Sequence, residues 1–271
     1  MAAGEGVTPA IDIRALSRVE ELEQCVQLQQ EAWGFSERDL VPRRMFVVAT
    51  KIGGLALGAW DREQLAGFAL ALPGRRGRQM YWHSHMLAVA EPYRDLGLGR
   101  QLKLAQRRAA LGAGIGWMEW TFDPLEIKNS YFNLSVLGAI ARRYYTDLYG
   151  SSSSRLQGSL PSDRLVAEWW LESERVRELA EPGESGRREP AREPVAAGLP
   201  AQAGVAVPRE VAEWKAAGDE RAVELQQLNR ETLQRAFGAG LACVGYMRRR
   251  EGGVFLLGRA PEDMPLVEAE A

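Results

Sequence analysis

The chain alternates between short apolar runs and longer stretches in which apolar residues recur every three or four positions. Residues 11–16 alternate between apolar and polar side chains, which predicts a first strand. Residues 19–33 carry apolar side chains at near-helical spacing and predict a helix, with Ser17 as its N-cap and Gly34 at its end. The chain is therefore expected to open with a strand followed by a helix.

Three short apolar runs follow a polar connection at residues 35–44. They cover residues 46–51, 55–60 and 64–72, and turn-forming sequences separate them. This pattern predicts two or three antiparallel strands joined by tight turns. The basic stretch 74–78 then predicts a solvated loop.

Residues 81–89 alternate strictly between two sets of side chains. One face of the predicted strand carries His83, His85, Leu87 and Val89, and the other carries Trp82, Ser84, Met86 and Ala88. Pro92 ends the strand because proline has no N–H to donate to a sheet. The chain has two histidines, and both lie on one face of this strand.

The turn after this strand leads into a helix. From Leu98 to about Gly112 apolar residues recur at helical spacing, so the turn at residues 94–99 lies at a helix N-terminus. Such an N-terminus presents N–H groups without intrahelical partners and the positive end of the helix dipole. Gly97 and Gly99 let the backbone approach an anion closely. The pattern therefore predicts a phosphate-binding turn.

The second half of the chain continues this order until its composition changes. Residues 116–124 and 164–171 predict a fifth and a sixth strand, and residues 129–150 predict a helix between them. Residues 173–204 are rich in Pro, Glu, Arg, Gly and Ala and lack the apolar density of a core. We expect a linker with little order there.

The last segment, residues 205–271, restarts the apolar pattern. It predicts a strand, a helix and a hairpin, over residues 205–207, 219–237, 241–247 and 253–257. We expect this segment to pack on a core formed by residues 1–172.

Composition excludes several classes of protein. The 271 residues are 46% hydrophobic and 26% charged, which is typical of a soluble protein. The formal net charge of −2 provides no basic field for nucleic acid. We expect no membrane span, because no stretch approaches about 20 apolar residues, and no secretion signal. Cys25 and Cys243 form no metal-spacing motif, which favours a reducing, cytoplasmic setting.

The strand, turn and helix around Arg94-x-x-Gly97-x-Gly99 resemble the signature of the GNAT (Gcn5-related N-acetyltransferase) superfamily. The resemblance implies an α/β (α+β) GNAT fold, a mixed and mostly antiparallel central sheet flanked by helices, here with a C-terminal helix–hairpin extension. It also implies that acetyl-CoA is the co-substrate. The pyrophosphate would bind the N–H groups of Arg94, Asp95, Leu96, Gly97, Leu98, Gly99 and Arg100, and the pantetheine arm would pair with Leu87, Ala88 and Val89. Later stretches resemble an uncharacterised bacterial subgroup of the superfamily.

The histidine pair resembles the corresponding strand of arylalkylamine N-acetyltransferases, where two histidines act as base or proton relay. His83 and His85 are therefore our candidates for removing the proton from an ammonium acceptor, work that a neutral imidazole suits. In other superfamily members a glutamate stands at the position of His83.

Further candidate site residues are a glutamate, one of two asparagines and a tyrosine. Glu119 is either a second base or a glutamate paired with an arginine. Asn129 or Asn133 would match the asparagine with which the superfamily contacts the pantetheine amide. Many superfamily members carry a tyrosine that protonates the leaving thiolate, but this chain has none at the expected spacing, so the identity of the general acid stays open. Tyr131, Tyr144 and Tyr145 are substitutes for it, or else aromatic side chains that only pack in the core.

The leading hypothesis is an N-acetyltransferase that transfers an acetyl or longer acyl group from acetyl-CoA to a primary amine. The amine, a small molecule or a peptide, would attack directly in a ternary complex. Two alternatives stay open: a non-catalytic acyl-CoA-binding module, and a metallohydrolase that uses the histidine pair. Unpaired strands at a sheet edge could support a homodimer, while the acceptor and the role of residues 205–271 in the site are open.

Overall fold

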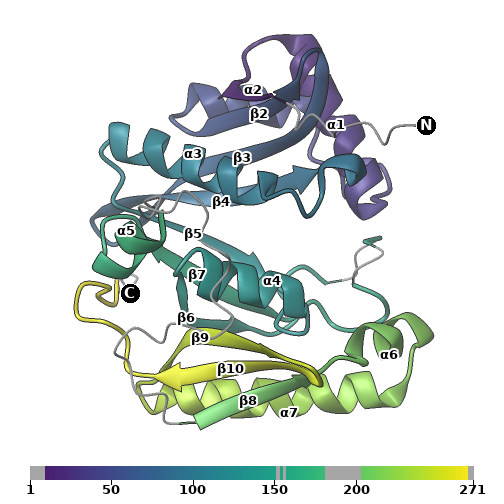
Figure 1. The fold of residues 1–271 in the computed structure, drawn as a ribbon, viewed down its shortest axis with the longest axis vertical. Helices are drawn as coiled ribbons and strands as arrows, with labels where there is room; N and C mark the ends of the chain where they lie inside the picture. The colour runs from purple at the N-terminus through teal and green to yellow at the C-terminus, as the bar shows by residue number, and fades with distance from the viewer. Residues whose placement is uncertain (1–9, 151–152, 155–156, 181–202, 268–271) are drawn as a thin grey trace, which may run out of the picture. The chain divides into compact units, whose positions relative to one another are not determined.

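The structure is a computed structural model that describes residues 10–150, 153–154, 157–180 and 203–267. The chain divides into two compact units. The first unit comprises residues 1–73 and 84–109, and the second comprises residues 74–83 and 110–271. Figure 1 labels the helices and strands along the chain.

The first unit is built on four neighbouring strands. They are β1 (Ile11–Ala15), β2 (Leu55–Asp61), β3 (Gln64–Arg76, up to residue 73) and the second half of β4 (Gln79–Val89, from residue 84), in that order. The pairs β1–β2 and β2–β3 are antiparallel. The helices are α1 (Val19–Trp33), α2 (Arg43–Lys51) and α3 (Leu98–Gly112, up to residue 109), with a short 3-10 turn at Glu91–Tyr93 before α3.

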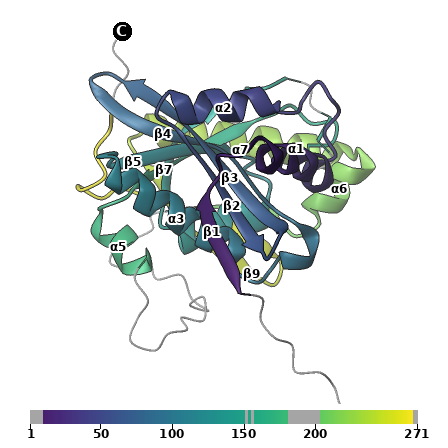
Figure 2. The same cartoon turned by 90° about the horizontal axis from the view of Figure 1, so that it is seen from above.

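Helices cover both faces of these strands. Phe68 of β3 packs against Phe46 of α2, with ring centroids 5.7 Å apart, and against Trp33 of α1. The neighbouring Gly67 faces Leu102 of α3 instead. Because successive residues of a strand point to opposite faces, α1 and α2 cover one face and α3 the other. Figure 2 shows this layering from above.

The second unit continues with seven strands among its described residues. They are β4 up to residue 83, β5 (Trp117–Phe122), β7 (Arg164–Trp170), β6 (Ile140–Tyr145), β9 (Ala242–Arg249), β10 (Gly252–Gly258) and β8 (Ala203–Pro208), in spatial order. The β4–β5 pair is parallel, whereas the pairs β5–β7, β6–β7, β6–β9, β9–β10 and β8–β10 are antiparallel. The fold class predicted from the sequence is therefore confirmed as a mixed, mostly antiparallel sheet flanked by helices.

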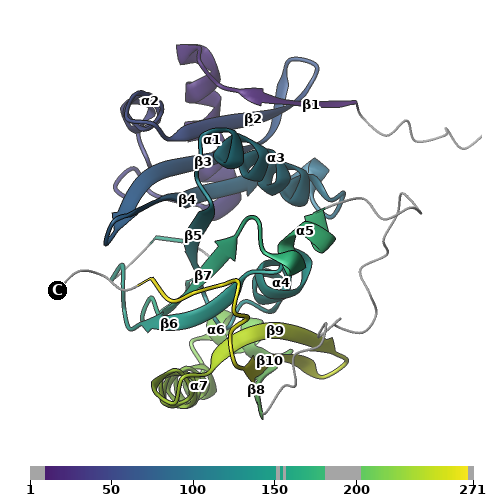
Figure 3. The same cartoon turned by 90° about the vertical axis from the view of Figure 1, so that its left-hand side faces the viewer.

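The helices of the second unit lie on both sides of its strands. They are α4 (Ile127–Tyr131), a π-helical turn (Phe132–Val136), α5 (Glu174–Ala180), α6 (Val211–Ala217) and α7 (Glu220–Gly238). The helix α4 contacts β9 and β10, whereas α7 contacts β6 and β8. Figures 1 and 3 show α4 and α7 on opposite sides of these strands.

The sequence interpretation was wrong at residues 46–51 and at the C-terminal half of 129–150. Residues 46–51 belong to α2, whose buried Phe46 and Ala49 are three positions apart, a helical spacing. Their β-branched neighbours Val47 and Val48 are exposed, so the apolar run does not lie in a sheet. The apolar content alone suggested a strand.

The predicted helix over residues 129–150 ends early. Gly138 adopts a left-handed conformation with φ of 78°, which stops the helical turn, and residues 140–145 then form β6 beside β7. A helix also replaces the expected linker at residues 174–180, while residues 181–202 lie outside the described part of the chain. The N-cap of α1 is Arg18, not Ser17.

Gly67→Ala tests the close approach between β3 and β4 in the first unit. A Cβ at Gly67 would lie 2.8 Å from the carbonyl oxygen of Ala88 and 3.2 Å from Leu102, so a neighbouring strand has to move. We expect a loss of about 1–3 kcal/mol in the free energy of unfolding, measured by urea denaturation. Gly112→Ala is the control, since a Cβ there meets nothing within 4 Å; an equal loss in both variants would contradict the assigned contact.

Candidate active site

The turn between β4 and α3 presents the start of a helix with open space around one glycine. Asp95 and Gly97 have φ values of 59° and 78°, so the chain reverses twice through left-handed conformations before α3 begins at Leu98. Leu98 and Leu102 are buried and anchor the helix. A Cβ at Gly97 would meet nothing within 4 Å, so there is open space beside this residue at the start of α3. This geometry can accept an anion at the helix N-terminus.

The predicted division of β4 into two faces is confirmed by burial. Trp82, Ser84, Met86 and Ala88 are buried, whereas His83, His85, Leu87 and Val89 are partly or fully exposed. Although His85 is exposed, the surrounding protein partly desolvates its imidazole and lowers its pKa below the usual 6.5. The exposed face therefore carries an imidazole that favours the neutral, proton-accepting form.

His83 and Glu119 are direct neighbours across two parallel strands. Trp82 pairs with Met118 and His83 with Glu119 in the β4–β5 register. Paired residues on adjacent strands point to the same face of a sheet. The imidazole and the carboxylate therefore lie on one face of the second unit.

Both oxygens of Glu119 are engaged by arginines. Arg76 Nη2 lies 3.0 Å from Oε1, and Arg143 Nη2 lies 2.6 Å from Oε2. The hydroxyl of Tyr81 also donates a hydrogen bond to this carboxylate; burial first, and then the charge and the hydrogen bond of Glu119, raise the pKa of Tyr81. The structure therefore shows the pairing of Glu119 with arginines that the sequence left open. A role of Glu119 as a second base stays a prediction.

Glu168 of β7 lies directly opposite Glu119 in the antiparallel β5–β7 register. Arg143 bridges the two carboxylates, since its Nε lies 3.0 Å from Glu168 Oε1, and Arg142 Nη2 lies 2.6 Å from Oε2. Burial alone would lower the pKa of Arg143, but the two carboxylates outweigh it and raise that pKa. The buried acids are thus held by a row of arginines.

Asn129 and Asn133 lie one helical turn apart. Asn133 is buried and donates to Asn129 Oδ1 over 3.3 Å, and its own Oδ1 accepts from Trp120 Nε1 over 3.1 Å. Asn129 is exposed. Of the two amides, only Asn129 is accessible without rearrangement.

A comparison with known protein families identifies part of the chain. The profile described as the acetyltransferase (GNAT) family matches residues 20–124. Residues 20–124 are thus similar to a GNAT acetyltransferase domain. The matched residues include β4, the glycine turn and β5, with His83, Gly97 and Glu119.

Several solved GNAT structures are similar to part of this chain, each at low identity and with a TM-score below 0.5. The ribosomal-protein-S18-alanine N-acetyltransferase from Escherichia coli is 15% identical, with a TM-score of 0.49, over 60% of this chain and 95% of that one. NAA60 from Arabidopsis thaliana in complex with acetyl-CoA is 15% identical, with a TM-score of 0.48, over 59% and 99%. A GNAT family acetyltransferase from Elizabethkingia anophelis with acetyl-CoA bound is 12% identical, with a TM-score of 0.45, over 60% and 99%. No curated protein matches this chain.

The tyrosines considered as general acids have different surroundings. Tyr144 donates to Asp163 over 2.5 Å, and burial with that contact raises its pKa far above the usual value, so it is a poor acid. Tyr145 is exposed on β6. Tyr131 is half-buried at the end of α4, with the Arg248 guanidinium 5.5 Å from its ring centroid. A role of Tyr131 as the general acid stays a prediction.

Two kinds of feature are absent from the described residues. No group of three or more His, Cys, Asp or Glu residues there could hold a metal ion, so a metallohydrolase would lack a ligand set within this part of the chain. None of the helices in the same part is both long enough and apolar enough to cross a membrane.

Sequence reasoning missed the arginines that hold Glu119. Arg76 was assigned to a loop but ends β3, and Arg143 was assigned to a helix but lies in β6. The two consecutive arginines after the apolar residues 139–141 are a signal that could have suggested buried partners, but only the strand register identifies Glu168 and Glu119 as those partners.

Arg143→Met tests the bridge between the two opposed carboxylates. The variant leaves Glu119 and Glu168 side by side without their shared cation, so we expect the free energy of unfolding to fall by about 3–5 kcal/mol at pH 7. Adding Glu119→Gln should recover part of the loss, because one buried charge is removed. Urea denaturation of the two variants measures both effects.

Arg209→Met is the matched control, because Arg209 forms an exposed, 4.0 Å pair with Glu210. We expect it to change stability by less than about 1 kcal/mol. A similar loss in the Arg143 and Arg209 variants, or no recovery in the double variant, would contradict a buried bridge.

Proposed function

We propose that this chain is an N-acetyltransferase that transfers an acetyl group from acetyl-CoA to a primary amine. The observation that carries the proposal is the turn before α3, which lies within the residues that match the GNAT family. Its left-handed Gly97, the open space around that residue and the start of a fifteen-residue helix suit a diphosphate.

The proposal assigns the pyrophosphate of acetyl-CoA to the N–H groups of residues 94–100 in the first unit. The helix dipole of α3 favours the negative charge there. Backbone groups of residues 87–89 would pair with the pantetheine arm, and their N–H groups would polarise the thioester carbonyl. Of the two asparagines considered for the pantetheine amide, Asn129 is the exposed one.

Proton removal from the acceptor is assigned to His83, directly or through His85 or a water molecule. An amine that arrives as an ammonium has no free electron pair, so it must lose a proton before it can attack a carbonyl carbon. Acetyl-CoA supplies the activated acetyl group. Glu119 beside His83 supplies a fixed negative charge, since its two arginine contacts hold it in place.

Calorimetric titration of the purified protein with acetyl-CoA tests the phosphate turn. We expect a micromolar Kd for the native protein and no measurable binding for Gly97→Glu, because the new carboxylate would repel the diphosphate at the helix N-terminus. Free CoA, which carries the same pyrophosphate, should bind comparably.

The matched control for this titration is Gly114→Glu, just beyond the C-terminal end of α3. Gly114 has a φ of 74° and open space at its Cβ, so the backbone strain and the added charge equal those at Gly97. Retained binding in this control with loss at Gly97 supports the proposal. Absence of binding by the native protein would overturn it.

His83→Gln separates binding from chemistry. The variant should keep the native Kd for acetyl-CoA, while kcat with a responsive amine falls by about 10²–10⁴, the usual contribution of a general base. Thiol release from acetyl-CoA in the presence of an amine panel measures the rate. An unchanged kcat would rule out His83 as the base, and acetyl-CoA binding without turnover of any amine would favour the non-catalytic binding module.

A further inference from the structure

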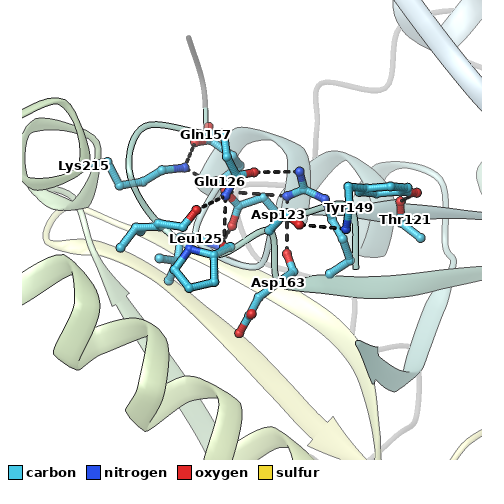
Figure 4. A network of polar contacts seen from close by, with 12 residues as sticks. Thr121, Asp123, Leu125, Glu126, Tyr149, Gln157, Asp163 and Lys215 are labelled. Atoms are coloured by element: carbon cyan, nitrogen blue, oxygen red, sulfur yellow. Dashed lines mark hydrogen bonds and ion pairs between the residues drawn. The ribbon is translucent and has the colours of Figure 1, made fainter. Parts of the chain in front are cut away.

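Lys215 is a buried lysine in α6, far along the chain from its partners. Its side chain is 5% exposed, and its Nζ lies 2.7 Å from Asp123 Oδ2 and 2.8 Å from Glu126 Oε1. Figure 4 shows the lysine reaching these carboxylates, which follow β5 directly. A residue of the C-terminal segment therefore contacts the exit of β5, within the second unit.

The geometry makes this contact strong. Burial disfavours an ammonium group, but Asp123 and Glu126 outweigh this effect and raise the pKa of Lys215 above its usual value. The ammonium group of Lys215 is thus charged at neutral pH and contacts two carboxylates, those of Asp123 and Glu126. Removing the cation would leave Asp123, which is buried, with only a longer 3.9 Å approach from Arg164.

The two carboxylates control how the chain passes from β5 into α4. Asp123 Oδ1 accepts a hydrogen bond from Leu125 N over 2.8 Å, which closes the turn. Glu126 is the N-cap of α4, and its carbonyl accepts from Ser130 N over 2.8 Å in the first turn of the helix. Lys215 therefore contacts both the turn, through Asp123, and the N-cap of α4, through Glu126.

The far end of the same segment is also held by the C-terminal part of the chain. Ser135 Oγ, in the π-helical turn after α4, accepts from Tyr246 N over 3.0 Å and donates to Tyr246 O over 2.7 Å. Residues 123–136 are thus attached at their start to α6 and at their end to β9. Between these two attachments lie Asn129 and Asn133, the latter fixed to Trp120 of β5.

We propose that Lys215 is a positioning residue for acetyl-CoA binding, which sets the placement of α4 and of Asn129 through Asp123 and Glu126. The inference rests on the proposed function for its effect on the co-substrate. It makes residues 205–271 a working part of the acetyltransferase, although the family match ends at residue 124.

Lys215→Met is the variant that tests this role, with Lys215→Arg as the conservative substitution. Arg221→Gln is the matched control: Arg221 lies in the same C-terminal segment and pairs with Asp219, but this pair is at the surface. Each protein is examined by amide hydrogen exchange without ligand and by calorimetric titration with acetyl-CoA.

The expected result is faster exchange over residues 123–136 in Lys215→Met, with native exchange over residues 98–109 of α3. The Kd for acetyl-CoA should rise about tenfold or more, because small displacements of a binding group have large effects. Lys215→Arg should recover much of both effects, and Arg221→Gln should behave as the native protein.

Two results would overturn the proposal: native exchange over residues 123–136 in Lys215→Met, or faster exchange with an unchanged Kd, which would make Lys215 purely structural. If the native protein binds no acetyl-CoA, the proposed function fails, whereas the exchange experiment still decides whether Lys215 holds α4. Should Lys215→Met not fold, Glu126→Gln replaces it, since Glu126 is 30% exposed and its loss leaves the Asp123 contact intact.

Discussion

The second unit depends on the neutralisation of carboxylates that its own strands bury. Glu119 and Glu168 lie directly opposite each other, and Asp163 is fully buried at the start of β7. An isolated buried carboxylate is several kcal/mol less stable than a hydrated one, so each needs a cation and hydrogen-bond donors. Arg143 serves the first two, and Arg230 contacts Asp163 over 2.8 Å from α7. The strands can pair in this register because these arginines are present.

The partners of these acids come from distant parts of the chain, which ties the segments together. Arg230 joins α7 to the start of β7, and Gln226 of the same helix donates to the carbonyl of Pro161. Arg142 joins Glu168 to the carbonyl of Pro265 near the end of the described chain. The strands β8, β9 and β10 extend the sheet beyond β6, yet β6 and β9 share only one registered pair, Ala141 with Cys243. Arginine and glutamine side chains therefore join segments of the second unit in addition to the backbone pairing of its strands.

Local patterns were enough to predict the elements that carry the candidate phosphate site. The alternation of β4, the glycines after it and the helical spacing of α3 each depend on residues close in sequence. The same reasoning was wrong for α2, where an apolar run proved to be a helix with exposed valines, and for β6, where Gly138 ends a helical turn. In both segments tertiary burial outweighs local propensity, and burial is not visible in a single sequence.

The electrostatic surroundings of His83 could not be predicted for the same reason. Glu119 was recognised as a carboxylate with two open roles, but its arginines lie 43 residues before it and 24 residues after it. Cross-strand register decides which charges meet, and a shift by one residue would point every side chain to the other face. The distinction matters for the chemistry, since a base works best with a free electron pair, whereas a doubly paired carboxylate acts as a fixed charge. The sequence thus shows which groups could take part in proton transfer, whereas only the register of β4, β5, β7 and β6 shows that His83 lies beside a carboxylate already held by arginines.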